Sequence, residues 1–406
     1  MSDHIAARLR ESLGAVALTQ SPGGRPRVAP DTIENAAGVL ALASAEGWSV
    51  QLEGQGSWGL PSATADLVVT TTGLDTIPKI AAADLVATVQ AGVSLAELNR
   101  KLHDAGIWLP WDPPGGPDRT IGGIIAAGTA GPLRLGFGPI RDSLVGCTIV
   151  TGDGRILRPG GIVVKNVAGY DLTRFQAGGF GAFGLIAELH LRLRANPGAD
   201  RTHLAHGDRD ILTRAGRGLI DGGLEPASLE LLSPALGAHA DWTLAVRLIG
   251  PDAAIGAQAA ALHGLTTLSW MELTREQASA FWHQAARGAL GGPVTLRLGT
   301  LLDGIDATID LLEERLDSGL ISAGAGTGSL RWTGSASAET LIQLRRITAE
   351  REIPLTVERA PGDVLAAVGH FGAYREGVGR LVAGLRGAFD PQGILQVPTD
   401  AEPHDA

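Results

Sequence analysis

Apolar and polar positions in the first half of the chain alternate between the spacing of helices and the spacing of strands. Two segments have the helical pattern, and each begins with a capping box and ends at a glycine: one runs from Asp31 to Gly47, the other from Ser94 to Gly106. Residues 121–127 are predicted to form a short helix of small residues whose N-terminus is available to an anion. Short apolar runs predict strands at 48–52, 66–70, 85–91, 144–150 and 155–157.

The pattern changes at about residue 196. We therefore expect a separate α+β domain there, with Asn196-Pro197-Gly198 as its boundary. Its predicted strands are 229–232, 243–249 and 294–299, and they are interleaved with helices at about 252–263, 274–288 and 304–316. The chain then divides into an N-terminal segment 1–27, a first domain 28–195, a second domain 196–380 and a C-terminal tail 381–406.

Glycine is unusually frequent and unevenly placed. It supplies 57 of the 406 residues, about twice the usual share. The glycines gather in four loops at 54–59, 115–131, 136–138 and 178–184. Because glycine has no Cβ, such loops let backbone N–H groups approach a ligand closely. We favour ligand binding over tight turns alone as the reason for four such loops.

Composition excludes several classes of protein. A single cysteine, Cys147, excludes an intrachain disulfide and any zinc or iron–sulfur site built from this chain's cysteines. The first residues lack the apolar core of a signal peptide, and no apolar run is long enough to cross a bilayer. The net charge of −10 argues against nucleic acid as the main partner. A cytoplasmic protein is expected, with membrane contact only through partners.

One glycine motif is rejected as a nucleotide site. The string Gly179-Phe-Gly-Ala-Phe-Gly184 matches the fingerprint of dinucleotide-binding folds, which has to open a helix that receives the pyrophosphate. Residues 185–194 instead alternate between apolar and polar side chains, which predicts a strand. The glycines can still line a ligand in another geometry.

Six short motifs follow one another along the chain. They are Glu53-Gly-Gln-Gly-Ser-Trp58, Asp112-Pro-Pro-Gly115, Thr120-Ile-Gly-Gly123, Lys165-Asn-Val-Ala-Gly-Tyr-Asp-Leu172, Gln176-Ala-Gly-Gly-Phe-Gly-Ala-Phe-Gly-Leu-Ile186 and Phe389-Asp-Pro-Gln-Gly393. In this order they resemble the vanillyl-alcohol-oxidase type of FAD-binding oxidoreductase, whose FAD domain is of the PCMH type. The resemblance covers residues 28–195 and, more loosely, the rest. Within the family, the motifs are most similar to the FAD-binding E subunits of bacterial glycolate oxidases.

This resemblance implies a fold and a cofactor site. The fold is α+β, with a PCMH-type FAD-binding domain of two subdomains, an α+β cap domain with an antiparallel sheet, and a tail that returns to the FAD domain. Loops 54–58 and 120–123 would hold the FAD diphosphate, and no covalent bond to FAD is expected because the first loop has Ser57 and Trp58 instead of His or Cys. The implied FAD-binding residues are Gly54, Gln55, Gly56, Ser57, Trp58, Pro114, Gly115, Thr120, Gly122, Gly123, Gly128, Gly131, Gly169, Tyr170, Asp171, Gly181, Gly184 and Ile186.

The resemblance also implies an activity. It is oxidation of a 2-hydroxy acid, glycolate to glyoxylate or D-lactate, with hydride transfer to FAD. Electrons would pass to a larger FAD-containing catalytic subunit and an iron–sulfur subunit of the same complex. A stand-alone FAD oxidase or dehydrogenase of another small alcohol is the alternative. A structural subunit with a vestigial flavin site is a third, weaker hypothesis.

The sequence identifies no catalytic base and no metal ligands. Relatives with their own catalysis have a histidine cluster in the cap, and this chain shows none: His203 and His206 are interpreted as a solvated pair, and His370 has no second ligand nearby. Candidate cations for a substrate carboxylate are Arg297, Arg331 and Arg359. For each of them, an outward position or a salt bridge with a neighbour such as Glu358 is the more expected role.

Overall fold

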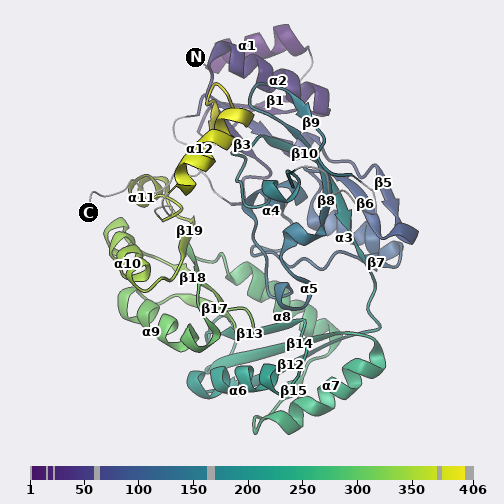
Figure 1. Ribbon diagram of the computed structural model, residues 1–406, viewed down its shortest axis with the longest axis vertical. Coiled ribbons are helices and arrows are strands. Elements are labelled where there is room, and N and C mark those ends of the chain that lie inside the picture. The colour runs from purple at the N-terminus through teal and green to yellow at the C-terminus, as the bar shows by residue number, and fades with distance from the viewer. Residues whose placement is uncertain are drawn as a thin grey trace.

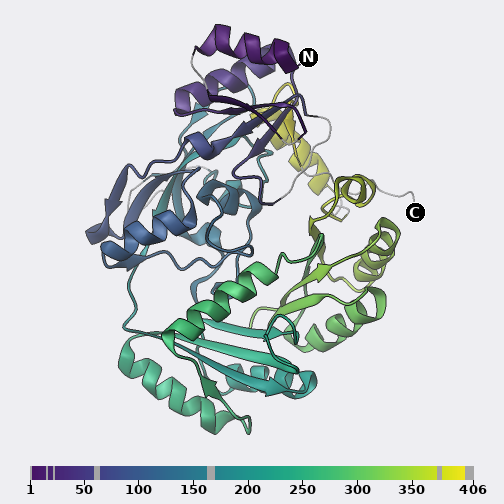
Figure 2. The ribbon, with the colours of Figure 1, turned by 180° about the vertical axis from the view of Figure 1, so that it is seen from behind.

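The computed structural model describes residues 2–14, 17–21, 23–58, 65–161, 170–372 and 377–397. Two five-stranded sheets and their helices form the upper part of the molecule in Figure 1, and an eight-stranded sheet with its helices forms the lower part. Figure 2 shows the same two parts from behind. None of the helices in the described ranges is long and apolar enough to cross a lipid bilayer.

The first sheet is mostly parallel and includes a strand from far along the chain. Its order is β1 (Ala17–Gln20), β2 (Pro26–Ala29), β4 (Leu67–Thr70), β3 (Val50–Glu53) and β20 (Leu395–Gln396). Only the β1–β2 pair is antiparallel, and Leu395 of β20 lies in register with Val50 of β3. Helices α1 (Ser2–Leu13) and α2 (Ile33–Glu46) pack their apolar faces against this sheet.

The second sheet is antiparallel throughout. Its order is β5 (Lys79–Ala81), β6 (Val86–Gln90), β10 (Leu185–Arg192), β8 (Leu144–Val150) and β9 (Ile156–Leu157). Helices α3 (Leu95–Asp104) and α4 (Ile121–Ala127) share its apolar core. Strand β10 starts directly after the rejected glycine fingerprint, so the strand predicted there is confirmed and the loop opens no helix.

The helices in this part of the molecule begin at residues whose side chains cap them. Ser94 and Thr120 accept hydrogen bonds from backbone N–H groups three residues on, as N-cap side chains do. Helix α2 departs by one residue from the sequence pattern: its N-cap is Thr32, while the Asp31 carboxylate accepts from the Asn35 side chain. Gly47 ends α2 at a φ of 69° in the left-handed region, as predicted.

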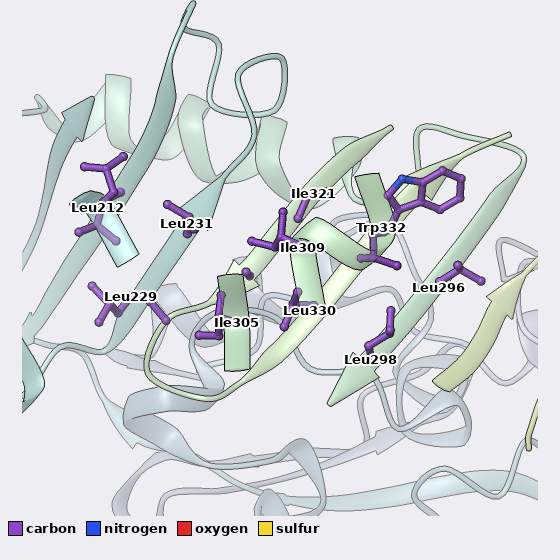
Figure 3. Close-up of a cluster of buried hydrophobic side chains, with 14 of the residues drawn as sticks. Leu212, Leu229, Leu231, Leu296, Leu298, Ile305, Ile309, Ile321, Leu330 and Trp332 are labelled. Atoms are coloured by element: carbon purple, nitrogen blue, oxygen red, sulfur yellow. The ribbon is translucent and has the colours of Figure 1, made fainter. Parts of the chain in front are cut away.

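The eight-stranded sheet is antiparallel and carries the cap. Its order is β15 (Met271–Glu272), β12 (Ala199–Gly207), β14 (Trp242–Gly250), β13 (Ser228–Leu232), β17 (Leu320–Gly324), β18 (Ser329–Gly334), β16 (Val294–Gly299) and β19 (Leu355–Arg359). Its helices are α6 (Arg209–Asp221), α7 (Asp252–Leu265), α8 (Arg275–Gly288), α9 (Ile305–Arg315) and α10 (Ala338–Glu350). Figure 3 shows its core, in which the Trp332 indole is buried among leucine and isoleucine side chains. The three strands and three helices predicted here all form.

Short elements join the two parts. They are β7 (Ile107–Trp108), β11 (Arg194–Ala195), α5 (Arg134–Phe137), α11 (Gly362–Val368) and α12 (Val378–Phe389). The backbone N–H of Gly115 donates to Ala286 O at 2.7 Å, and that of Gly136 donates to Ala227 O at 3.1 Å. Loop 112–119 of the upper part therefore contacts the cap directly. The structure fits the expected α+β fold with an antiparallel cap sheet.

Candidate functional site

A cavity of about 310 Å³ lies where the loop after β3, the start of α4 and the turn before β10 converge. Eleven of the residues singled out from the sequence line it: Gly54, Gln55, Gly56, Ser57, Trp58, Thr120, Gly122, Gly123, Gly181, Gly184 and Ile186. Its size falls at the lower end of the range for small-molecule and cofactor sites. The cavity thus brings together loops that the sequence separates by up to about 130 residues.

Glycine is required where these loops touch each other. A Cβ on Gly54 would collide with the Thr120 side chain, so the first loop can lie against the start of α4 only with glycine there. Gly184 has a φ of 114° and its backbone packs on the Val150 carbonyl, a position that no other residue fits without strain. The local glycines therefore set the shape of the cavity wall.

The first loop presents unpaired donors to the cavity. Among the described residues, no acceptor takes the backbone N–H groups of Gln55, Gly56, Ser57 and Trp58. Successive backbone N–H groups of this kind form anion-binding concavities. The Thr71 hydroxyl also lines the cavity, is buried, and finds no partner in the described part of the chain. Gln55, Gly56 and Ser57 are exposed, whereas the Thr71 hydroxyl is buried and is costly to leave without a partner unless a bound group satisfies it.

Sequence reasoning missed a cation in the cavity wall. The Arg119 side chain is buried, at 3 % exposure, and its guanidinium stacks over the Trp58 ring at 4.3 Å. Its Nη1 donates to Pro114 O at 3.0 Å and to Thr129 Oγ1 at 3.2 Å. Burial lowers the pKa of Arg119 to about 10, so it stays charged at neutral pH. Its only sequence signal was its place directly before the helix cap Thr120, inside a glycine-rich loop.

The structure places several implied FAD residues outside the cavity lining. They are Pro114, Gly115, Gly128, Gly131, Tyr170 and Asp171. The Tyr170 side chain is 95 % exposed, and Asp171 accepts a hydrogen bond from the Arg174 backbone. Gly169 lies outside the described residues, as does most of the motif Lys165–Leu172.

The cap arginines are largely engaged by one carboxylate. Glu358, at 1 % exposure, accepts from Arg331 Nε at 2.6 Å and from Arg297 Nε at 2.8 Å. Burial alone would raise the pKa of Glu358, but the two guanidinium groups outweigh it and hold that pKa below its usual value. The expected ion pairs with Glu358 are thus confirmed for Arg297 and Arg331. Arg359 instead donates to Leu290 O at 3.2 Å.

Two further carboxyl groups lie near the boundary between the parts. The Glu230 carboxyl is buried, and it accepts from Ser322 Oγ at 2.8 Å. Burial raises the pKa of Glu230 to about 8 and that of Asp112 to about 7. Asp112 also accepts from the Leu133 backbone at 3.0 Å. Both groups therefore hold protons in a range where most carboxyl groups are ionised.

The interpretation of His203 and His206 as a solvated pair is wrong. His203 is 2 % exposed within strand β12, and neither of its ring nitrogens has a partner in the described part of the chain. His206 Nδ1 lies 2.9 Å from Thr243 Oγ1. His370 is buried as well, and burial lowers its pKa to about 4. Across the described ranges, no three His, Cys, Asp or Glu side chains are grouped closely enough to hold a metal ion.

Comparison with known proteins gives a family and a fold. Residues 26–160 match the model of an FAD binding domain. The chain is 33 % identical to glycolate oxidase subunit GlcE of Escherichia coli over 269 residues, which cover 65 % of this chain and 69 % of that protein. It is 28 % identical to glycolate oxidase subunit GlcD of Bacillus subtilis over 437 residues, which cover 97 % and 92 %.

Solved structures agree on the fold. p-Cresol methylhydroxylase superposes with a TM-score of 0.77 at 13 % identity, over 97 % of this chain and 95 % of that one. 4-Ethylphenol oxidase from Gulosibacter chungangensis gives a TM-score of 0.74 at 13 % identity, over the same shares of the two chains. The fold expected from the motif order is confirmed.

The residues at the cavity fit FAD. Its diphosphate is an anion with many acceptor oxygens, and the loop Gln55–Trp58 offers unpaired backbone donors in a row. The matched FAD binding domain contains both this loop and the segment Thr120–Gly123. The lining is otherwise rich in apolar and glycine surface, as a flavin and an adenine require.

Proposed function

Because this chain belongs to the FAD-binding oxidoreductases with a PCMH-type domain, which act on CH–OH groups, we propose that its substrate is a small 2-hydroxy acid. We further propose that it is the FAD-binding subunit of a glycolate oxidase-type complex, with glycolate or D-lactate as the acid. The observation that carries this proposal is similarity to two glycolate oxidase subunits, one of them over 97 % of this chain. FAD, when bound, supplies the hydride acceptor.

In this proposal the glycine loops hold the cofactor without a covalent bond. The backbone N–H groups of Gln55–Trp58 bind the diphosphate, and Thr71 adds a hydroxyl donor. The backbone of Ile186 at the start of β10 lies along the same wall and is assigned to adenine. The implied residues that do not line the cavity keep their FAD-binding roles as predictions from the motifs.

The proposal also divides the chain by role. Residues 28–195 hold FAD and residues 196–380 cap it. The tail 381–406 returns to the FAD domain, and the pairing of β20 with β3 supports that return.

Binding a 2-hydroxy acid requires a cation for its carboxylate. Arg331 donates hydrogen bonds from Nε and Nη2 to the Glu358 carboxylate, and Arg359 donates one to the carbonyl of Leu290. Arg297 is 38 % exposed and uses Nε for Glu358 and Nη2 for Thr356 Oγ1, and Arg359 uses only Nη1, so both keep guanidinium nitrogens without an acceptor among the described residues. We assign the substrate carboxylate to one of these two arginines and name no base for the hydroxyl proton.

Partner subunits complete the electron path in this proposal. With one cysteine, buried Cys147, the chain cannot build an iron–sulfur cluster itself. Electrons that leave the flavin for such a cluster must pass to another chain. The proposed partners are a larger FAD-containing catalytic subunit and an iron–sulfur subunit.

The test is anaerobic reduction of the purified chain, alone and with its co-expressed neighbours. We expect a yellow protein whose FAD is released by acid, little bleaching by glycolate or D-lactate when alone, and fast bleaching in the complex. Fast bleaching of the isolated chain by either acid would favour a stand-alone dehydrogenase. A colourless protein that takes up no added FAD would contradict the proposal altogether.

A further inference from the structure

Helix α12 (Val378–Phe389) carries a row of apolar side chains on its exposed surface. Val378, Leu381 and Leu385 recur at the spacing of one helix face and are 37 %, 68 % and 38 % exposed. None of the three joins a hydrophobic cluster formed by the described residues. An exposed apolar row on a helix is typical of a surface that a partner covers.

The charges beside this row are all positive. Arg380 and Arg386 are the charged residues of α12, and at about 100° per residue they lie on opposite sides of the row. Neither forms an ion pair or a side-chain hydrogen bond with a residue that the structure describes. The face is therefore complementary to an apolar surface with carboxylates at its rim.

The position of α12 relates this face to the FAD cavity. Phe389, at the end of the helix, is buried, and its ring centre lies 5.8 Å from that of Phe183. Before the helix, the ring centre of Phe371 lies 5.7 Å from that of Phe180, which lines the cavity. Both ends of segment 371–389 thus contact the turn before β10, so a partner on α12 is brought next to a wall of the cavity.

We propose that the exposed face of α12 is the docking surface for the iron–sulfur subunit of the complex, an inference that rests on the proposed function. In that function electrons leave this chain's flavin for another chain. Helix α12 offers that chain an apolar face beside the cofactor cavity, with two arginines for its carboxylates.

Other occupants of this face fit less well. A second copy of the chain, related by a twofold axis, would bring like-charged faces together. An anionic membrane surface would be opposed by the net charge of −10. Residues 398–406 of the chain itself have only proline and alanine as apolar residues, too little to cover the row.

The experiment measures the affinity of the full chain, loaded with FAD, for the separately purified iron–sulfur subunit. For Leu381→Asp we expect that affinity to fall at least about tenfold, because an apolar contact is replaced by a charge. FAD content and thermal unfolding should not change, since Leu381 is largely exposed. Arg380→Glu should weaken binding about threefold, and more at low salt than at high salt.

The matched control is Ile211→Asp. Ile211 is an exposed isoleucine on α6, which lies far below α12 in Figure 1, so this variant should bind the iron–sulfur subunit like the wild type. Equal losses for Leu381→Asp and Ile211→Asp would show that the loss does not come from α12, and would overturn the inference.

Three parallel measurements test the other occupants. They are the affinity for the larger flavin subunit, sedimentation with vesicles that contain phosphatidylserine, and light scattering of the chain alone. If Leu381→Asp changes only one of these and not the binding of the iron–sulfur subunit, the face serves that other partner and the inference is wrong. If the wild-type chain binds neither subunit, the proposed function fails and the inference with it. If the wild type binds the iron–sulfur subunit and Leu381→Asp binds it equally well, only the inference fails.

Discussion

Two arginines with little exposed surface, one in each part of this molecule, have opposite surroundings. Arg331 in the cap donates a hydrogen bond to the Glu358 carboxylate, which also accepts one from Arg297. Arg119 in the FAD domain donates its hydrogen bonds to neutral oxygens and stacks on an aromatic face, and no carboxylate in the described part of the chain lies within ion-pair distance of it. The contrast is between these two arginines, because buried polar atoms without a partner in the described part of the chain occur in both parts, at Thr71 and at His203 for example.

The difference shows which of the two arginines has its counter-charge within hydrogen-bond distance in the same part of the chain. Arg331 forms an ion pair with Glu358 in the interior of the cap. The attraction between the two charges offsets the cost of removing them from water. The Arg119 side chain is buried beside the cavity without such a pair in the described part of the chain. Both parts keep some buried polar atoms without a partner in the described part of the chain, Thr71 Oγ1 at the cavity and the His203 ring nitrogens in the cap.

The largest expected effect comes from breaking the cap's charge cluster. Glu358→Gln leaves Arg331 buried beside a neutral amide, and we expect the free energy of unfolding to fall by about 3–5 kcal/mol. Denaturant unfolding of the apoprotein measures it. Glu313→Gln, which removes an exposed partner of Arg209, is the matched control and should cost less than about 1 kcal/mol. Equal costs for both variants would mean that the cap's charges are not paired as described.

The pH dependence of stability distinguishes two buried carboxyl groups of the cap, Glu230 and Glu358. Glu230 has a folded-state pKa of about 8, above its ordinary value of 4.5, so the folded state holds the proton more tightly than the unfolded chain. Stability should therefore decrease as the pH rises from about 5 to about 8, by at most about 1.4 kcal/mol for each pH unit. Unfolding free energies at a series of pH values measure this slope.

Glu230→Gln should flatten that slope, and the remainder should come from Asp112, whose pKa is raised to about 7. Glu358 behaves with the opposite sign. Its depressed pKa means that its contribution is present above its ordinary pKa and is lost only as the pH falls below it. A variant Glu230→Gln with the wild-type slope would show that this carboxyl is ionised in the folded chain.

A smaller effect is expected where the cavity loops meet. Gly54→Ala places a methyl group against the Thr120 side chain, and relieving that collision should cost about 1–3 kcal/mol of stability. Because the loop must move away from α4, affinity for FAD should fall at least about tenfold, as measured by fluorescence titration of the apoprotein. Unchanged affinity would show that the contact between these loops does not set the geometry of the site.

The smallest effect has the opposite sign. Gly256 lies in helix α7 of the cap with open space where a Cβ would go. Gly256→Ala should stabilise the protein by about 0.5–1 kcal/mol, since alanine is the better helix former, and should leave FAD affinity unchanged. Thermal and denaturant unfolding check the first part. The pair of glycine variants then separates glycines needed for the cavity from glycines that are merely tolerated.

Local pattern predicted most elements and the loops that form the cavity. Helix caps, glycine stops and apolar spacing are properties of neighbouring residues, so α3, α4 and β8 are readable from the chain. Strand β12 was missed because its charged start appears solvated. In the structure Asp200 pairs with Arg247 on the adjacent strand β14, at 2.7 Å, a partner that no local pattern reveals.

The candidate site shows the same limit. The glycine loops predicted a ligand site. Which side chains are buried there could not be predicted in the same way, because burial depends on residues distant in sequence. Arg119 looked like one charged residue among many, and only its stacking on Trp58 and its lack of a carboxylate mark it out. Tyr170, taken as a cofactor residue from its motif, is almost fully exposed.

The pairing of β20 with β3 makes the first sheet depend on residues near the other end of the chain. Strand β3 leads directly into the amides of Gln55–Trp58, and one of its two neighbours in the sheet is Leu395–Gln396. During synthesis that neighbour leaves the ribosome only after the FAD domain and the whole cap have emerged. The sheet that carries the loop Gln55–Trp58 is therefore complete only after residues 395–396 have been synthesised.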